Sequence, residues 1–297
     1  MHLNKNDTQT VTIKHGVMGG LFSRIIGRFA GWRTGFMISG LTIILIFAVM
    51  ALAAPLLTSF DPTKGSFEVL QPPSYSHVLG TDNLGRDIFS RIVYGARTIL
   101  SILLLSTMIS MSIGMPLGLI SGFFSGIIDR ALSIIMDSIY AFPSLLLAIV
   151  VALMLGPSPL NTAISIAFVY IPTYYRMIRG QTLSIKAQLY VEAAIASGIR
   201  TRRILLKHIL PNLLPTLVVI FSLSAADAIL TEAGLSYLGY SVVPPTPDWG
   251  YDLYVGREYV LSGYWWLSFF PGLMVVLLSV GFALIGEALS DIYNPRR

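Results

Sequence analysis

Six apolar stretches, each about as long as a membrane-spanning helix needs to be, constrain the fold of this chain more than any other feature. They lie near 36–57, 98–123, 132–155, 160–177, 213–233 and 267–289. Because a segment surrounded by lipid must satisfy its own backbone hydrogen bonds, each stretch is predicted to be a helix. Of the 297 residues, 54% are hydrophobic and 12% are charged, against roughly 25% charged in soluble domains. The sequence therefore predicts an all-α, polytopic membrane protein with six transmembrane helices.

The distribution of basic residues predicts the orientation. If the N-terminus is cytoplasmic, the inner segments hold 15 of the 20 Lys and Arg residues and the outer segments hold five. An excess of Lys and Arg marks the cytoplasmic side, so a multi-pass protein of the cell inner membrane with both termini cytoplasmic is expected. The net charge of +5 is spread between the apolar runs rather than gathered in a patch, which argues against nucleic acid as a partner.

Several kinds of site are excluded by residue type. The chain has no cysteine, so disulfides and thiolate metal sites are ruled out. Its four histidines lie far apart without the spacing of metal ligands, and no metal site is expected. A signal peptide is not expected either, because the first apolar run is as long as a span and no small-residue cleavage site follows it.

Composition divides the chain into five segments. Before the first span, apolar residues share one helical face with arginines between them, which is typical of a helix lying along the cytoplasmic leaflet. Glycine and proline inside the spans, such as Gly118 and Pro143, indicate kinks or close helix contacts, or else ordinary irregularities of membrane helices. The predicted segments are a disordered cytoplasmic tail (1–20), an interfacial amphipathic helix (21–34), the first transmembrane helix and outer loop (35–97), a core transmembrane domain (98–291) containing a cytoplasmic loop (185–212), and a cytoplasmic tail (292–297).

The cytoplasmic loop 185–212 has the pattern of two short helices set at an angle. Its Glu-Ala-Ala run at 192–194 favours a first helix, and Gly198 suits the left-handed position that ends one. Thr201 is placed to cap a second helix, whose apolar face would end before Pro211. An elbow with basic flanks that protrudes from a membrane bundle is suited to docking onto another protein, although a purely structural elbow would have the same pattern.

This loop resembles the hallmark of the binding-protein-dependent permeases of ATP-binding-cassette (ABC) importers. Their pattern is Glu-Ala-Ala, three residues, Gly, nine residues, then Ile-x-Leu-Pro. His208 stands where the broad pattern has isoleucine, and His-Ile-Leu-Pro-Asn is similar to the version in the peptide and nickel branch. In that family the loop sits in a groove of the ATPase subunit. The resemblance therefore implies an ATPase-coupling role for Glu192, Ala193, Ala194, Gly198, His208, Leu210 and Pro211.

Four further segments occur in the order found in the dipeptide, oligopeptide and nickel permeases. They are 79–97 before the second span, Asp137 with 142–148 in the third, 228–239 at the end of the fifth, and 244–250 in the last outer loop. The whole pattern is similar to a C-type permease subunit of the type I importer (MetI-like) class. It implies a homologous B-type permease subunit, two ATP-binding cassette subunits and an extracytoplasmic solute-binding protein as partners within the lipid bilayer.

The chain has no Gly-Lys dipeptide, so it cannot hold a P-loop. We therefore expect a non-catalytic subunit without cofactor, with ATP and Mg bound by partner subunits. A secondary transporter or channel would not need the loop and would show inverted repeats. A membrane hydrolase using Asp137, Asp227 and Glu232 would lack a histidine at their depth. Peptides are the expected solute, and nickel chelates, metallophores, glutathione and oligosaccharides are alternatives.

Two acids, Asp227 and Glu232, lie in the fifth apolar stretch. An ionised carboxylate facing lipid is costly, so each is expected to face a partner helix or an aqueous path. Both are candidates for the translocation path. For Glu232, structural pairing is the favoured interpretation. Asp227 would attract a cationic solute or a peptide amino terminus, unless it is paired with a neighbour or protonated.

The outer segment before the second span carries charges of both signs, at Asp82, Arg86, Asp87 and Arg91. The favoured interpretation is an ion-pair lattice that holds the outer loop. The alternative is contact with a docked solute-binding protein, for which the candidates are Arg86, Asp87 and Trp249.

Overall fold

The computed structural model describes residues 18–293, and in this part of the chain the regular structure is helical, with no β-strand. Its elements are α1 (Met18–Leu52), α2 (Ala54–Leu57), α3 (Ile88–Phe124), α4 (Gly126–Tyr140), α5 (Ser144–Leu155), α6 (Pro159–Lys186), α7 (Leu189–Ala196), α8 (Thr201–Ile204), a π-helical turn η1 (Leu205–Ile209), α9 (Leu210–Tyr237), α10 (Trp249–Val260) and α11 (Trp266–Tyr293).

Four helices are long and apolar enough to cross a membrane singly: Thr34–Leu52 of α1, α3, the continuous helix Thr201–Tyr237, and α11. With 37 residues, α3 extends about 55 Å, well beyond the roughly 30 Å apolar core of a bilayer. The predicted start of this span near residue 98 marks only its apolar part, because the helix begins ten residues earlier, at Ile88.

The third predicted span, 132–155, is helical but not straight, and it breaks next to Pro143, one of the residues that indicated kinks. It is the pair α4 and α5, bent by 91° at the break after Tyr140. Pro143 precedes α5 as its N-cap, and a proline disfavours helical backbone in the residue before it, here Phe142. Counted as one broken span, the pair brings the described chain to five.

The fourth predicted span, 160–177, lies in α6, which has 28 residues but is not among the helices apolar enough to cross on composition alone. The reason is its position inside the bundle, where it buries polar side chains such as Thr162, Ser165 and Tyr174. A helix surrounded by other helices does not need an apolar surface on every side.

Close packing of α3 against α6 depends on glycine. A Cβ on Gly118 would lie 2.5 Å from the carbonyl oxygen of Tyr175, and Gly114 and Gly122, one turn before and after, meet α6 as closely. Small residues spaced four apart let two membrane helices approach backbone to backbone. Close contact is therefore the role of these glycines, among the alternatives left by the sequence.

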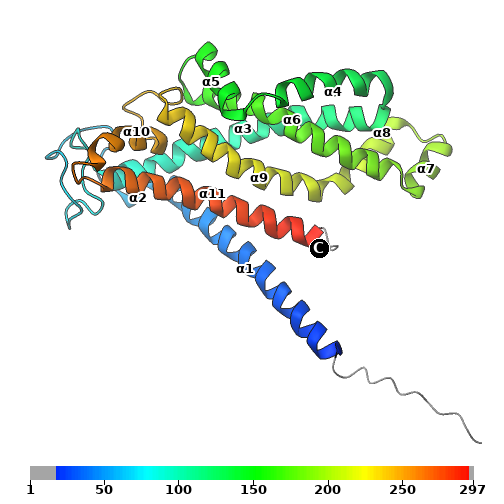
Figure 1. The fold of residues 1–297 in the computed structure, drawn as a ribbon, viewed down its shortest axis with the longest axis horizontal. Helices are drawn as coiled ribbons and strands as arrows, with labels where there is room; N and C mark the ends of the chain where they lie inside the picture. Colours follow the sequence, from blue (N-terminus) through cyan, green and yellow to red (C-terminus); the bar gives the residue numbers. More distant parts are fainter. Residues whose placement is uncertain (1–17, 294–297) are drawn as a thin grey trace, which may run out of the picture.

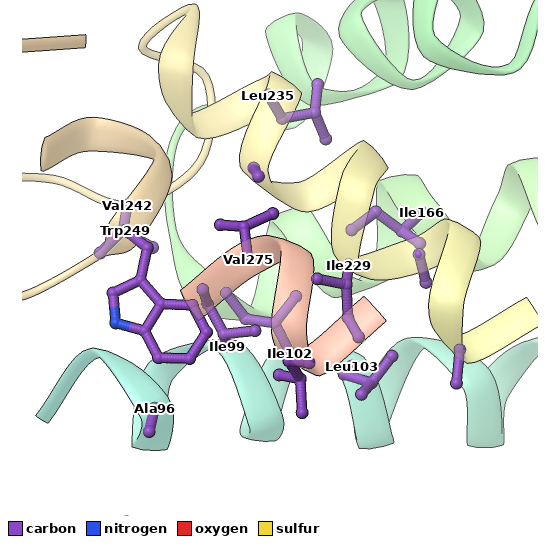
Figure 2. Close-up of a cluster of buried hydrophobic side chains, with 14 of the residues drawn as sticks. Ala96, Ile99, Ile102, Leu103, Ile166, Ile229, Leu235, Val242, Trp249 and Val275 are labelled. Carbon is purple, nitrogen blue, oxygen red and sulfur yellow. The ribbon is translucent and has the colours of Figure 1, made fainter. Parts of the chain in front are cut away.

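The main core lies between α3, α6, α9 and α11 and extends to the end of the bundle at which Trp249 lies. Figure 2 shows Ile99, Ile102 and Leu103 of α3 facing Ile229 of α9, with the ring of Trp249 closing the cluster at one end. Trp249 is fully buried, and its indole packs edge-on against Phe47 with ring centroids 5.5 Å apart.

The long helices run along the molecule between two ends (Figure 1). The segment 58–87 lies with α10 at one end, which is called the outer end because the distribution of Lys and Arg predicts that it faces outward, and α7 and α8 lie at the other. Helix α1 packs on α11, with Gly40 against the carbonyl oxygen of Gly281, and diverges from the bundle toward its N-terminus. The predicted interfacial helix 21–34 falls inside α1, and its placement on the leaflet stays a prediction. Most of the predicted tail 1–20, and residues 294–297 of the other, lie outside the described residues.

Candidate functional site

Residues 185–212 are called the coupling loop after the role that the resemblance implies for them. The first half of this loop is a short helix ended by a glycine. Helix α7 contains Glu192, and its C-terminus has a Schellman motif: the amide of Gly198 donates to the carbonyl of Ile195 (3.0 Å) and that of Ile199 to Ala194 (3.2 Å). Gly198 has φ +71°, a conformation that glycine adopts without steric cost. The predicted left-handed position of Gly198 is confirmed.

The second half of the loop differs from the prediction. Thr201 is the first residue of α8 rather than its cap, and the N-cap Arg200 makes no side-chain cap hydrogen bond. The helix does not end before Pro211 but continues through η1 into α9. Pro211 lacks the amide that an α-helix needs at that position, and the wider π turn precedes it. The elbow is therefore one short helix joined to the N-terminal end of a long transmembrane helix.

The loop is fixed to the bundle by its own apolar cluster. Val191 and Ala194 of α7 are buried with Ile204 and Ile209 against the ends of α3, α6 and α9. Other apolar side chains of the loop remain exposed, with Leu189 84% exposed and Tyr190, Ile195 and Leu206 also exposed. Exposed apolar groups on an element outside the membrane mark a surface for another protein.

A groove of about 450 Å³ runs beside this surface, lined by Leu183, Lys186, Ala187, Glu192, Ile195 and Ala196. Glu192 lies in the first turn of α7, where a carboxylate interacts favourably with the helix dipole. Ala193 is exposed on the same helix. The structure thus exposes Glu192 and Ala193 on α7, with Glu192 lining the groove, whereas Ala194 is buried against the bundle.

The His-Ile-Leu-Pro-Asn run is tied back to α7. The Asn212 Nδ2 donates to the backbone carbonyl of His208 (2.6 Å) and to the hydroxyl of Tyr190 (3.1 Å). The rings of Tyr190 and His208 lie 6.4 Å apart. Leu210 and Pro211, which lie between His208 and Asn212 in the sequence, form the first turn of α9. Motion of α7 would therefore reach α9 directly.

A second feature, about 510 Å³ in volume, is a cavity at the break between α4 and α5. Its walls come from the break, α6 and α9, and are formed by Ile139, Tyr140, Phe142, Ser144, Val169, Tyr170, Thr173, Asp227, Leu230 and Thr231. Asp227 is exposed. One of the two predicted path acids is thus placed in a cavity, whereas Glu232 lies outside its lining.

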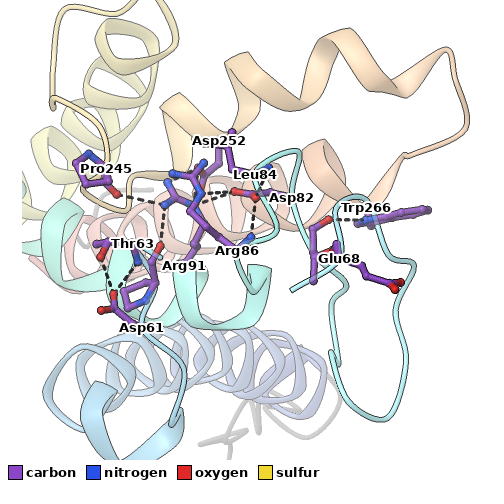
Figure 3. Close-up of polar contacts among 12 residues, drawn as sticks. Asp61, Thr63, Glu68, Asp82, Leu84, Arg86, Arg91, Pro245, Asp252 and Trp266 are labelled. Carbon is purple, nitrogen blue, oxygen red and sulfur yellow. Dashed lines mark hydrogen bonds and ion pairs between the residues drawn. The ribbon is translucent and has the colours of Figure 1, made fainter. Parts of the chain in front are cut away.

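At the outer end, charged side chains form a buried lattice (Figure 3). Arg91 is 1% exposed and binds Asp252 through Nη2 (2.6 Å) and Nε (3.0 Å), and it also donates to the carbonyls of Pro62 and Pro245. Arg86 pairs with Asp82 at 2.6 Å. Burial raises the pKa of the Asp252 carboxyl, and the Arg91 guanidinium opposes that rise. These contacts match the ion-pair lattice favoured from the sequence.

The three residues proposed for docking of a binding protein are all buried. Asp87 caps α3 by accepting from the amide of Ser90 (2.8 Å) and pairs with His77 (2.9 Å). The indole of Trp249 donates to the carbonyl of Ile92 (3.0 Å). Like Arg86, these side chains lie below the surface rather than on it. Their part in docking stays a prediction.

Glu232 is buried beside a second acid, Asp248. Glu232 accepts from Ser241 (2.9 Å), and Asp248 accepts from Ser236 and from the amide of Tyr251. One buried oxygen of each carboxyl has no hydrogen-bond partner, although the two groups lie close enough to interact. Two carboxylates cannot hydrogen-bond to each other, so we expect one shared proton to supply the missing donor.

Most of this chain matches the sequence profile of a protein family. The profile of the family described as "Binding-protein-dependent transport system inner membrane component" matches residues 114–297, which include the coupling loop and the cavity. The chain belongs to this family.

Similar curated proteins are permeases of peptide transport systems. This transport component is 40% identical over 261 residues to the dipeptide transport system permease protein DppC of Alkalihalophilus pseudofirmus, covering 87% of the chain and 85% of the relative. It is 38% identical to the di/tripeptide transport system permease protein DppC of Pseudomonas aeruginosa (87% and 88% covered). It is 37% identical to the glutathione transport system permease protein GsiD of Pectobacterium atrosepticum (87% and 86% covered).

The fold of this permease is also found in solved structures. A chain of the MetNI methionine ABC transporter in an inward-facing conformation superposes with a TM-score of 0.57 at 19% identity, covering 70% of this permease and 98% of that chain. The predicted MetI-like class is therefore confirmed at the level of the fold.

Several residues important to these sites were not predicted from the sequence. Asp252 and Asp248, the partners of Arg91 and Glu232, lie in the outer loop and carry no local signal of their pairing. The break that forms one wall of the cavity does have a local signal in the sequence. The Phe142-Pro143 dipeptide, in the middle of an apolar run, indicates a helix end.

Proposed function

We propose that this permease forms, with a homologous B-type permease subunit, the path by which peptides cross the cell inner membrane. In this proposal an extracytoplasmic solute-binding protein delivers the peptide at the outer end. Two ATP-binding cassette subunits, which bind ATP and Mg, dock on the coupling loop, and both termini of the permease are cytoplasmic.

The observation that carries the proposal is the coupling loop. It is packed onto the ends of the transmembrane helices by buried Val191 and Ile209, yet it leaves Leu189 and Ile195 exposed beside a groove. An element that is firmly seated on the helices and apolar on its outer side is suited to pass motion of a docked protein into the bundle. The solute is supported by the similar permeases of peptide systems.

Glutathione is a second candidate solute, supported by similarity to the GsiD permease. Glutathione is itself a small peptide with a free amino group. It therefore fits the same proposal and differs only in the solute delivered.

The assembled complex in proteoliposomes provides the test. We expect ATP-dependent uptake of labelled dipeptides, and ATPase activity that rises when the peptide-loaded binding protein is added. Uptake of methionine or of a nickel chelate in place of peptides would overturn the assignment of the solute. ATP-independent uptake by the permease alone would overturn the importer mechanism.

The orientation has its own test, in reporter fusions after Arg297 and within the outer loop 244–249. The excess of Lys and Arg on the inner segments predicts that the first reporter is cytoplasmic and the second is not. Finding both on the same side of the membrane would contradict the topology.

A further inference from the structure

The cavity at the α4–α5 break has the size and position of a ligand site. Its volume of about 510 Å³ lies within the range of small-molecule sites, roughly 300–1,000 Å³. It exists because the chain turns by 91° between α4 and α5, which brings the break against α6 and α9.

The walls of the cavity combine hydroxyl groups with apolar surface. Five of the lining residues carry a hydroxyl, four are apolar and one is an acid. The hydroxyls of Tyr170 and Thr231 hydrogen-bond each other at 3.0 Å, and that of Thr231 donates to the backbone carbonyl of Asp227 at 2.9 Å. These bonds fix α6 to α9 and hold the polar wall in place around the acid.

Asp227 supplies the charge of the cavity. Among the residues that the structure describes, no lysine or arginine lines this cavity, and the Asp227 carboxylate has no hydrogen bond or ion pair. Arg176, one turn beyond Thr173 on α6, is engaged elsewhere: it pairs with Asp137 at 2.8 Å and lies 4.1 Å above the ring of Tyr140. The cavity is therefore negative and holds no cation of its own.

An unpaired carboxylate at membrane depth is costly, and such groups mark the path of an ion or substrate. A cationic group entering the cavity would supply the missing counter-charge, in surroundings that strengthen the attraction compared with water. Hydroxyl groups on the wall offer acceptors for the remaining protons of an ammonium group.

We infer that this cavity binds the ammonium group of the transported peptide, with the Asp227 carboxylate as its counter-ion. The inference rests on the proposed function and adds an orientation to it. The peptide's own carboxylate would be repelled by Asp227, so the amino end enters the cavity and the carboxyl end points away.

The test compares uptake by the whole importer carrying Asp227→Asn with uptake by the wild type, peptide by peptide. Dividing the two rates cancels the preference of the binding protein, which is the same in both. Three probes are used: dialanine, N-acetyl-dialanine, and N-acetyl-alanyl-lysine. Asp227→Glu restores the charge, and Glu287→Gln removes an exposed acid of α11 that is not in the cavity lining.

For dialanine we expect the Asn variant to be slower by about tenfold, the loss expected for one charge-assisted hydrogen bond. N-acetyl-dialanine should be unaffected, Asp227→Glu should recover dialanine uptake, and Glu287→Gln should match the wild type. A loss for the lysine probe as well would mean that the cavity takes ammonium groups of side chains too, which still supports the site.

Two results would overturn the inference. Equal rates for wild type and Asn variant with dialanine would mean that Asp227 does not meet the peptide. An equal loss for all three probes, with less assembled complex, would mean that Asp227 is a structural residue. If the wild type imports none of the probes, the proposed function itself fails, which is a different outcome from either.

Discussion

At the outer end of the bundle, charged side chains are buried and paired with one another, whereas at the coupling loop apolar side chains are exposed. Arg91 is 1% exposed and holds Asp252 together with two backbone carbonyls, so its hydrogen-bonding needs are met within the chain. Leu189 of α7 is 84% exposed although it lies outside the transmembrane helices. The buried charges of the outer end are thus paired within the chain, whereas the coupling loop has an exposed apolar surface suited to contact with another protein.

The difference separates two kinds of importance. Residues of the outer lattice should matter for stability, because each buried charge depends on its partner. Residues on the exposed face of the coupling loop should matter for communication with a docked subunit and little for folding. Variants at the two ends therefore test whether this division is real.

The largest effect on stability is expected from Arg91→Met. It leaves Asp252 buried without its counter-charge, and breaking such a pair costs about 3–5 kcal/mol. We expect little complex in membranes and a much lower thermal midpoint of the purified complex in detergent. Adding Asp252→Leu removes the second charge and should recover part of the loss.

The matched control for Arg91→Met is Lys64→Met, at an exposed ion pair with Asp61 in the same outer segment (3.1 Å). Hydrogen bonds from the hydroxyl and amide of Thr63, and then the contact with Lys64, lower the pKa of Asp61 to about 2. Little change is expected there, because exposed pairs contribute little. If Arg91→Met melted like the control, the outer lattice would not be a source of stability.

An intermediate effect is expected from Gly198→Val at the coupling loop. A Cβ there meets nothing within 4 Å, so the cost is backbone strain alone, roughly 1–2 kcal/mol for a non-glycine residue in a left-handed conformation. We expect near-normal amounts of subunit in the membrane, with transport lost and stimulation of the ATPase weakened.

Gly198→Asn is the control for that substitution, because asparagine tolerates the left-handed region. It should retain most of the transport. Normal ATPase stimulation by loaded binding protein in Gly198→Val would show that the loop does not couple the two activities.

The two ends also differ in how far the sequence alone predicts them. The geometry of Gly198 was predictable because a helix end followed by glycine is a local signal, and the Glu-Ala-Ala spacing lies within one loop. The pairing of Arg91 with Asp252 joins residues 161 positions apart, which no local pattern encodes. The presence of a charge lattice, and the pairing of Arg86 with Asp82 within it, were predictable from the mixed signs, whereas the partner Asp252 was not.

The same distinction applies to the membrane helices. Apolar stretches located the spans, since hydropathy reports what faces lipid. It did not reveal the bend between α4 and α5 or the continuity of α9 with the loop, which depend on Pro143 and on the π turn before Pro211. Asp227 was recognised as anomalous from its position, whereas the cavity around it required the fold.

The smallest effect on stability is expected from Glu232→Gln. This result would be an exception to the comparison of the two ends, because Glu232 is a buried acid at the outer end, where substitutions of charged residues are otherwise expected to be strongly destabilising. If Glu232 and Asp248 share one proton, as expected from their two unpaired oxygens, an amide at position 232 that donates to Asp248 replaces the acid with little change in shape or charge. We expect a thermal midpoint close to the wild type, a difference of less than about 1 kcal/mol. Glu232→Ala removes the donor and leaves Asp248 buried and unsatisfied, at a cost of about 1–3 kcal/mol. The infrared carbonyl band of a buried carboxylic acid should be present in the wild type and absent in Glu232→Gln. If the Gln variant were instead as unstable as Arg91→Met, both acids would be ionised, and the outer end would need a counter-charge from outside the chain.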